Sequence, residues 1–206
     1  NINLNEEKAV SVENIDEIFV NAESANVEVY RLANLEEAKI SLNGRIRSIG
    51  AKKDTVLKLY TKVEGSKVNV WTQFEEGTEL RPFTGSMKIE VYLPDEYSKK
   101  LSINTSSGNA QVKNFGGDLN FQSASGKFNY KAKDDFKGNI NVGTASGHIT
   151  LDLPKNSDLE IMAKTISGKV KCSLPIECSD NKIIGTLGKG TSNVTLNTAS
   201  GNITVQ

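Results

Sequence analysis

A serine nucleophile needs a general base beside it, and this chain has a single histidine to offer. That residue, His148, follows Ser146 with only Gly147 between them. Base activation requires a contact of about 2.6–3.2 Å between hydroxyl and imidazole. If the chain bends at the glycine, the serine faces inward and the histidine outward, so the contact is not made. We therefore predict no catalytic residue, no hydrolytic activity and an exposed turn position for His148.

Paired carboxylates are a second route to hydrolysis, and two adjacent acidic pairs occur. Glu75 and Glu76 form one, and Asp134 and Asp135 form the other. Adjacent residues point to opposite faces of a strand, so we interpret both pairs as solvated loop charges. A carbohydrate-active β-helix enzyme, which needs several carboxylates converging on neighbouring coils, is the alternative function from the enzyme class.

Cys172 and Cys178 are the two cysteines of the chain. In an oxidising compartment they are close enough in sequence to bridge across a turn, and otherwise they are free thiols, so both states stay open. A metal site needs further ligands nearby, and His148 lies far along the chain. We expect no metal ion and no cofactor.

Three aromatic residues, Trp71, Phe74 and Phe83, bracket a long irregular connection at 72–86. Aromatic side chains on exposed loops hold flat ligands such as sugars or peptides, which makes these three the candidate binding residues. The structural alternative is a hydrophobic cap that closes the end of a β core, and it is the simpler interpretation.

Charge and hydropathy exclude two classes of partner. The chain has 25 Lys and Arg against 25 Asp and Glu, so it offers no basic stripe for nucleic acid. No apolar run approaches the roughly 20 residues that span a bilayer, so we predict no membrane-spanning segment.

The elements that position these residues belong to a repeat. Each copy reads apolar-x-apolar-x-Thr/Ser-x-Ser-Gly-x-apolar-x-apolar, which predicts a strand, a Ser-Gly corner and a second strand. Five copies align without gaps and a sixth is degenerate, at 101–112, 119–130, 140–151, 161–172, 194–205 and 18–29. We expect successive coils in which equivalent strands pair in parallel.

The corner residues have two expected roles. The glycine, as in Gly147, is expected to adopt a backbone conformation forbidden to other residues. The hydroxyls on either side of the variable position, Thr144 and Ser146 in that copy, are expected to face inward and bond backbone groups at the bend. The same roles are assigned in the other copies to Thr105/Ser107, Ser123/Ser125, Thr165/Ser167 and Thr198/Ser200.

Outside the repeat the strand pattern is less regular. Residues 40–49 read as a strand, an Asn-Gly turn and a strand, 56–71 as a hairpin turning at Gly65, and 87–94 as a strand. Helical signals are weak and short, so little helix is expected. Two glycine-rich stretches, 114–121 and 185–193, lack the helix that a phosphate site needs and are interpreted as loops.

We therefore predict an all-β protein, a single-chain β-helix or β-solenoid of short repeats. Residues 1–206 form one domain, with a less regular N-terminal β part at 1–95 and regular Thr-x-Ser-Gly repeats at 96–206.

The segments at 140–154, 161–175 and 196–205 resemble the bacterial family labelled "putative adhesin", a domain of unknown function built from such repeats. The resemblance implies a secreted or envelope-tethered β-solenoid, located outside the cell or at the cell surface, and implies no catalytic residue. The predicted function is a non-catalytic extracytoplasmic interaction module that binds a protein or a cell-envelope polymer. An ectodomain that regulates the envelope stress response is a further alternative.

Overall fold

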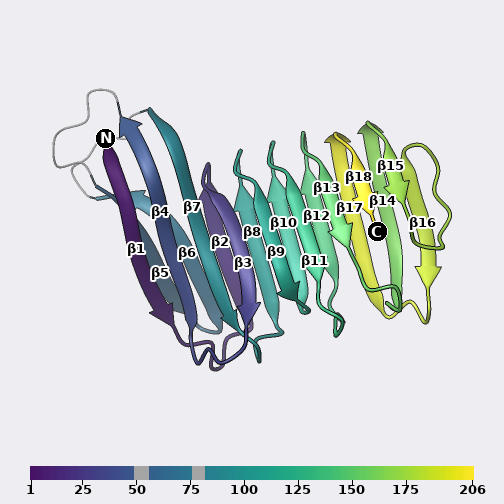
Figure 1. Cartoon of the computed structure of the whole chain (residues 1–206), viewed down its shortest axis with the longest axis horizontal. Helices are drawn as coiled ribbons and strands as arrows, with labels where there is room; N and C mark the ends of the chain where they lie inside the picture. The colour runs from purple at the N-terminus through teal and green to yellow at the C-terminus, as the bar shows by residue number, and fades with distance from the viewer. Residues whose placement is uncertain (49–55, 76–81) are drawn as a thin grey trace.

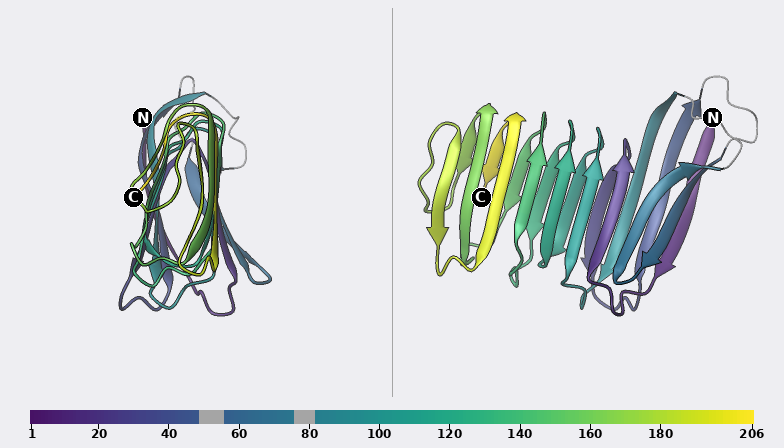
Figure 2. Two further views of the ribbon diagram at one scale, coloured as in Figure 1. Left: turned by 90° about the vertical axis from the view of Figure 1, so that its right-hand side faces the viewer. Right: turned by 180° about the vertical axis from the view of Figure 1, so that it is seen from behind.

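The computed structural model describes residues 1–48, 56–75 and 82–206. Its strands form two sheets that face each other along the whole molecule (Figure 1, Figure 2). In spatial order, sheet A contains β1 (Ile2–Val10), β4 (Ala38–Ser48), β7 (Phe83–Pro94), β3 (Asn26–Leu32), β9 (Ala110–Phe115), β11 (Phe128–Ala132), β13 (Ile149–Asp152), β18 (Ile203–Val205) and β15 (Val170–Cys172).

Sheet B is the second layer. In the same direction it contains β5 (Leu57–Glu64), β6 (Lys67–Phe74), β2 (Glu17–Glu23), β8 (Lys100–Thr105), β10 (Asp118–Ser123), β12 (Ile140–Thr144), β17 (Ser192–Ser200), β14 (Leu159–Ser167) and β16 (Lys182–Leu187). The described part of the chain contains no helix, and each repeat contributes one strand to each sheet. The predicted all-β solenoid is confirmed.

Equivalent positions of the repeat lie side by side in parallel strands, as predicted. In sheet B the first apolar column runs through Ile18, Leu101, Leu119, Ile140, Val194 and Ile161. In sheet A the corresponding column runs through Val27, Ala110, Phe128, Ile149, Ile203 and Val170. This register keeps every apolar side chain of the repeat between the sheets, whereas a slip of one residue would expose them all.

The coils do not stack in chain order, which corrects the expectation of successive coils. The last coil of the chain, β17/β18, lies between β12/β13 and β14/β15 (Figure 1). The reason is β16, which pairs antiparallel with the outer edge of β14 and ends beside Leu159, where β14 begins. Only the inner edge of β14 is then free, and β17 pairs with it in parallel.

The glycine-rich stretch 185–193 contains the turn that carries the chain past the start of β14. Gly188 and Gly190 have positive φ angles of 57° and 66°, a region that favours glycine. Asp158, the residue before β14, binds this turn. Its carboxylate accepts a hydrogen bond from the amide of Lys189 at 2.9 Å. Its carbonyl accepts another from the amide of Ser192 at 3.1 Å. The predicted loop is confirmed only for residues 188–191, because 185–187 end β16 and 192–193 begin β17.

The N-terminal part contains a further coil that the sequence pattern did not reveal. Strand β6 pairs in parallel with β2, and β7 pairs in parallel with β3, so β6/β7 stacks outside β2/β3. Strands β5, β4 and β1 then extend the two sheets by antiparallel pairing. At each end of the stack, the chain therefore passes the position of one coil and fills it later. That coil is β6/β7 at one end and β17/β18 at the other.

Of the local predictions in this part, the hairpin that turns at Gly65 (φ +62°) is confirmed as β5/β6. The Asn-Gly turn within 40–49 is wrong, because β4 runs straight through Gly44. Gly44 pairs with Met87 across the sheet, and a Cβ on Gly44 would lie 2.2 Å from the carbonyl oxygen of Ser86. This glycine is needed because two backbones approach closely there, not because the chain reverses.

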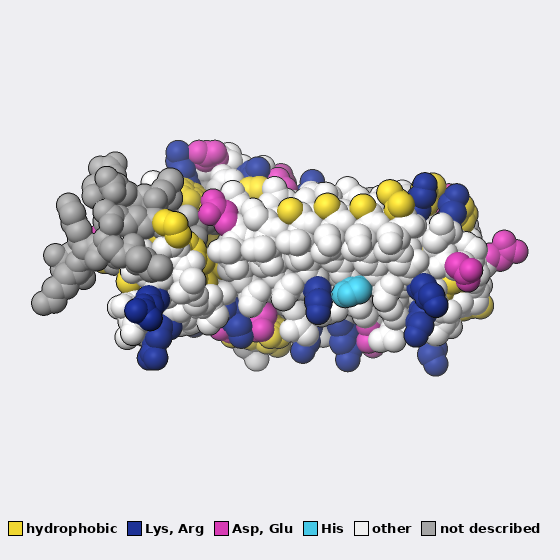
Figure 3. Space-filling model, turned by 90° about the horizontal axis from the view of Figure 1, so that it is seen from above, with side chains coloured by type: hydrophobic (Ala, Val, Ile, Leu, Met, Phe, Trp, Pro, Cys, Tyr) yellow, Lys and Arg dark blue, Asp and Glu magenta, His cyan; other side chains and the backbone are white. Residues whose placement is uncertain are grey.

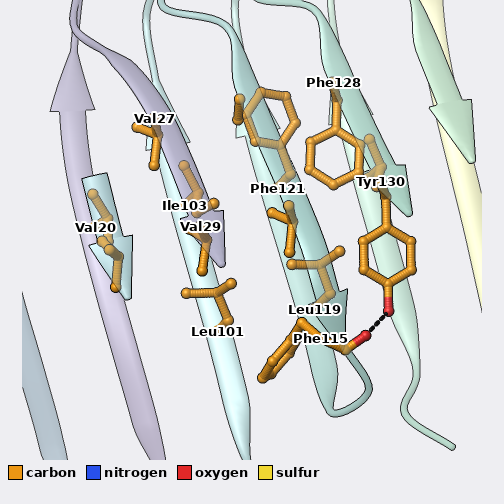
Figure 4. Close-up of a cluster of buried hydrophobic side chains, with 14 of the residues drawn as sticks. Val20, Val27, Val29, Leu101, Ile103, Phe115, Leu119, Phe121, Phe128 and Tyr130 are labelled. Atoms are coloured by element: carbon orange, nitrogen blue, oxygen red, sulfur yellow. Dashed lines mark hydrogen bonds between the residues drawn. The ribbon is translucent and has the colours of Figure 1, made fainter. Parts of the chain in front are cut away.

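The core lies between the sheets and forms one continuous cluster of buried residues from Leu4 to Val205. Aromatic side chains fill its middle, where the rings of Phe121 and Phe128 stack with centroids 4.7 Å apart (Figure 4). The buried hydroxyl of Tyr130 donates a hydrogen bond to the carbonyl of Phe115 at 2.6 Å. Organisation as one cooperative domain remains a prediction.

Candidate functional site

In four of the five Ser-Gly corners the first hydroxyl bonds the backbone, as predicted. Thr165 donates to the carbonyl of Gly201 at 2.7 Å, and Thr198 donates to that of Gly147 at 3.1 Å. Both oxygens belong to the neighbouring coil, so these hydroxyls join coils at the corner. Thr144 departs from the pattern, because its buried hydroxyl has no partner among the described residues.

The second hydroxyl is different, and its predicted inward position is wrong. Exposed positions are occupied by Ser107, Ser125, Ser146, Ser167 and Ser200. The chain has already bent at Ser107, Ser125 and Ser146, whereas Ser167 and Ser200 are the last residues of β14 and β17. Seen from above, the corners form a ridge of largely uncharged residues, and His148, the cyan side chain, lies beside it (Figure 3). The exposed serines are surface residues of this ridge.

The explanation predicted for the corner glycines is also wrong, because none of them has a positive φ. They are required by proximity between coils. A Cβ on Gly126 would lie 2.1 Å from the carbonyl oxygen of Gly108, and one on Gly147 would lie 2.1 Å from that of Gly126. In the next two coils, a Cβ on Gly201 would lie 2.2 Å from the carbonyl oxygen of Gly147, and one on Gly168 would lie 2.0 Å from that of Gly201. Each corner thus packs backbone directly against backbone.

His148 is exposed, as predicted, and it has a structural partner. Its Nδ1 accepts a hydrogen bond at 2.9 Å from the amide of Asn202 in the next coil. Asn109 and Asn202 do the same from the equivalent position, accepting from the amides of Lys127 and Lys169 at 2.8 and 2.9 Å. The imidazole therefore replaces an amide in a ladder between coils. No hydrogen bond joins Ser146 to His148 in the described structure.

Because the histidine acts as an acceptor, His148→Asn is expected to leave the free energy of unfolding unchanged. His148→Ala is expected to lower it by about 0.5–1.5 kcal/mol, the net contribution of one hydrogen bond. Thermal unfolding of the two variants measures the difference. Equal losses for Asn and Ala would show that the bond to Asn202 contributes nothing.

The three candidate binding residues are separated by the fold. Phe74 and Phe83 contact each other edge to face, with centroids 6.0 Å apart, and pack against the core. This packing favours the structural alternative for Phe74 and Phe83. Trp71 points the other way, onto the outer face of sheet B, where its ring stacks on that of Tyr60 at 5.6 Å and 16°. Its indole nitrogen donates to the side chain of Gln73 at 3.2 Å.

Tyr60 and Trp71 begin a row of side chains in register that crosses the outer face of sheet B from strand to strand. We call it the amide row, and it consists of Tyr60, Trp71, Asn21, Asn104, Gln122, Gly143, Asn197 and Lys164. The adjacent row contains Asn69, Phe19, Ser102, Asn120, Asn141, Thr195 and Met162. The central part of this face therefore presents neutral amides and hydroxyls.

Phe19 and Tyr60 are parts of this surface that the sequence analysis missed. Phe19 had a detectable signal, because its column in the other copies holds Ser102, Asn120, Asn141, Thr195 or Met162. An aromatic residue at an outward position of a polar column indicates a surface role. Tyr60 had no such signal, since its place beside Trp71 depends on the register of the β5/β6 hairpin.

Two hollows lie along the amide row. The first, about 400 Å³, is lined by Phe19, Asn21, Asn69 and Trp71 together with the ion pair of Lys62 and Glu64. The hydrogen bond within that pair raises the pKa of Lys62 and lowers the pKa of Glu64. The second, about 560 Å³, lies around Gly143 and is lined by Gln122, Asn197 and Lys164 among others.

The face of sheet A is different in character. Tyr30 and Tyr92 stack there at 5.6 Å, and their hydroxyls donate to Glu28 and Glu90 at 2.8 and 2.7 Å. Partial burial and the bond to Glu28 raise the pKa of Tyr30 to about 12. Partial burial favours the protonated form of Glu28, but the bonds from Tyr30 and Lys88 prevail and lower its pKa. A general acid needs the opposite shift, so Glu28 is unsuited to acid catalysis.

The acidic pairs singled out from the sequence have structural partners. Asp135 accepts two bonds from the buried guanidinium of Arg31, at 3.0 and 3.3 Å, and Asp95 lies 3.6 Å from the same group. Asp135 lies in a turn and its side chain is 57% exposed, as the loop-charge interpretation implies, but it also pairs with Arg31. Glu75 forms an ion pair with Lys58. Glu76 lies outside the described residues.

Cys172 and Cys178 are free thiols, and burial raises the pKa of Cys172. Among the described residues no group of His, Cys, Asp and Glu has the arrangement of a metal site. The described chain likewise contains no helix long and apolar enough to cross a membrane.

Comparison with known proteins identifies relatives by family and by fold. A family model described as "Toastrack DUF4097" matches residues 11–206. The crystal structure of a "putative cell adhesion protein" from Clostridium sporogenes ATCC 15579 superposes with a TM-score of 0.71 at 15% identity, covering 99% of each chain. A "putative adhesin" from Bacteroides fragilis NCTC 9343 gives a TM-score of 0.40 at 13% identity, covering 100% of this chain and 98% of that one. No curated protein matches the chain.

Proposed function

The chain belongs to the Toastrack DUF4097 family, and from that premise we propose that it is a non-catalytic extracytoplasmic module that binds a polymer of the bacterial cell envelope. The binding surface is the outer face of sheet B. The observation that carries the proposal is the amide row, in which neutral hydrogen-bonding side chains repeat from coil to coil beside an aromatic pair. A surface that repeats at a constant interval suits a ligand that repeats as well.

The proposed location follows the family resemblance and the description of the Clostridium sporogenes structure as a "putative cell adhesion protein". A polymer fits this surface better than a folded protein does. The central parts of protein interfaces are depleted in polar groups and enriched in apolar and aromatic residues, whereas Asn104, Gln122 and Asn197 occupy the centre here. A peptide that adds a strand needs a free sheet edge, and these strands are paired on both sides.

The binding surface is tested by co-sedimentation of the purified protein with an envelope fraction from a bacterium that encodes a member of the Toastrack DUF4097 family. The double substitution Asn104→Glu and Gln122→Glu places two charges on the face of sheet B and is expected to abolish co-sedimentation. The matched control, Gln111→Glu and Asn129→Glu, places two charges on the same two coils in sheet A and is expected to have no effect. Equal behaviour of the two variants would contradict the proposed surface.

The non-catalytic character is tested separately. We expect no turnover of ester, peptide or glycan substrate panels above the buffer control. Turnover that disappears in His148→Ala or Ser146→Ala would contradict it and favour the enzyme alternative.

A further inference from the structure

We propose that the amide row binds one unbranched, uncharged glycan chain, with Trp71 as its stacking platform. The inference rests on the proposed function and names the class of polymer. It is argued from the chemistry of the row, the two hollows along it and the absence of charge between them.

The aromatic end provides a rigid platform. Tyr60 covers one side of the indole of Trp71, and the bond from its ring nitrogen to Gln73 further restrains the ring. The first hollow opens beside Trp71 and is lined by Phe19, Asn69 and the ion pair of Lys62 and Glu64, whereas Tyr60 does not line it. A sugar ring has an apolar face of C–H groups and a rim of hydroxyls. An aromatic ring bordered by amides matches both features, because the ring packs on the face while the amides bond the rim.

The amides along the row are available to a ligand. The side chains of Asn21, Asn104 and Asn197 form no hydrogen bond with another described residue, and each has two donors and an acceptor to offer. Gln122 donates to Asn120 at 3.1 Å and retains its carbonyl oxygen. Neutral groups that both donate and accept suit hydroxyls, which do the same.

The second hollow indicates that the ligand is a chain rather than a single sugar. It lies in the same row around Gly143, between Gln122 and Asn197. The absence of a side chain at Gly143 lets the carboxamide of Gln122 lie over the glycine, with its oxygen 2.5 Å from where a Cβ would be. Four strand intervals separate Trp71 from Gly143, and at about 4.8 Å per interval this is roughly 19 Å. An unbranched chain of several sugars is needed to occupy both hollows.

The charges on this face determine which glycans fit. From Trp71 to Asn197 the row contains no charged side chain, and two cations, Lys164 and its register partner Lys182 in β16, follow at that end. An acidic polymer would find no series of cations along its length, and nucleic acid is excluded for the same reason. The ligand is therefore uncharged over most of its length.

Trp71 is the only tryptophan of the chain, so its fluorescence reports on the proposed site directly. The intact protein is titrated with uncharged β-1,4-linked N-acetylglucosamine oligomers of two to eight units, with neutral β- and α-glucan oligomers, with alginate oligomers as acidic probes and with a peptide library. We expect a spectral shift with at least one neutral series, an affinity that increases with chain length, and no response to the acidic or peptide probes.

Calorimetry with the best glycan tests the residues. Trp71→Ala is expected to weaken binding about tenfold or more, and Trp71→Phe to weaken it less. Asn104→Leu keeps the shape of the side chain, removes its hydrogen bonds and is expected to weaken binding as well. Tyr92→Ala disrupts the stacked pair on the opposite sheet and is the control expected to bind normally.

The inference would be overturned if no neutral series bound, or if the protein responded to peptides alone or to alginate alone. Normal glycan binding by Trp71→Ala would overturn it as well. Such a failure is distinct from that of the proposed function. If envelope co-sedimentation persists and still depends on the face of sheet B, the proposed function stands and only the class of polymer is wrong. If co-sedimentation is absent as well, both fail.

Discussion

Deletion of residues 192–206 is expected to abolish cooperative folding, although these residues are only the last coil of the chain. Strands β17 and β18 lie inside the stack, between β12/β13 and β14/β15, and they bury Val194, Leu196, Ile203 and Val205 almost completely. Removing one such side chain costs about 2–5 kcal/mol, and the whole stability of a domain is about 5–15 kcal/mol. The loss of four exceeds what the fold can tolerate, because β14 and β15 lose the strands that join them to the rest of the stack.

Circular dichroism during heating and limited proteolysis measure this effect. The matched control deletes residues 1–10, which removes β1 from the free edge of sheet A and leaves every other strand pair intact. The control is expected to melt cooperatively at a reduced temperature. A cooperative transition in the 192–206 deletion at the temperature of the intact protein would mean that the last coil is not interposed.

The second large effect is expected at the corner, where Gly147→Ala should lower the free energy of unfolding by about 3 kcal/mol, at the upper end of overpacking costs. The added methyl would lie 2.1 Å from the carbonyl oxygen and 2.9 Å from the carbonyl carbon of Gly126, and both are backbone atoms that a rotamer change does not move. The coils β10/β11 and β12/β13 would have to separate at the corner, and this strains the parallel pairing of β10 with β12 and of β11 with β13.

Gly65→Ala is the control that separates proximity from backbone conformation. Gly65 has a φ of +62°, and a Cβ there would meet no atom within 4 Å, so its cost is the conformational one of about 1–2 kcal/mol. Denaturant unfolding of both variants is expected to rank Gly147→Ala as the more destabilised. The reverse order would show that the corner glycine serves conformation after all.

The regular half of the fold was predictable because its pattern repeats. Identical columns with apolar residues at period two define both the strands and their parallel register, and Leu101, Leu119 and Ile140 pair as their alignment implies. Stacking order was not predictable, because any coil of the repeat can bind any other through the same columns. The order depends on β16, a strand outside the repeat that occupies the outer edge of β14.

The site was predictable only in part, for a related reason. Trp71 was recognisable as an aromatic residue beside an irregular segment, but its separation from Phe74 follows from strand parity, which alternates sides along β6. Its neighbours Asn21 and Asn104 are distant in sequence and meet it only after the coils are stacked. The corner glycines show the same limit, because the closeness of Gly126 and Gly147 is a property of the stack and not of either segment.

Hydroxyl-radical footprinting of the protein bound to an envelope fraction tests the central claim most directly, namely that the outer face of sheet B is the binding surface. The two sheets carry comparable reporters, since Trp71 stacks on Tyr60 in sheet B and Tyr30 stacks on Tyr92 in sheet A. The account predicts that binding protects Trp71, Tyr60 and Phe19 from oxidation and leaves Tyr30 and Tyr92 unchanged. Protection of Tyr30 and Tyr92 with Trp71 still fully reactive would contradict it.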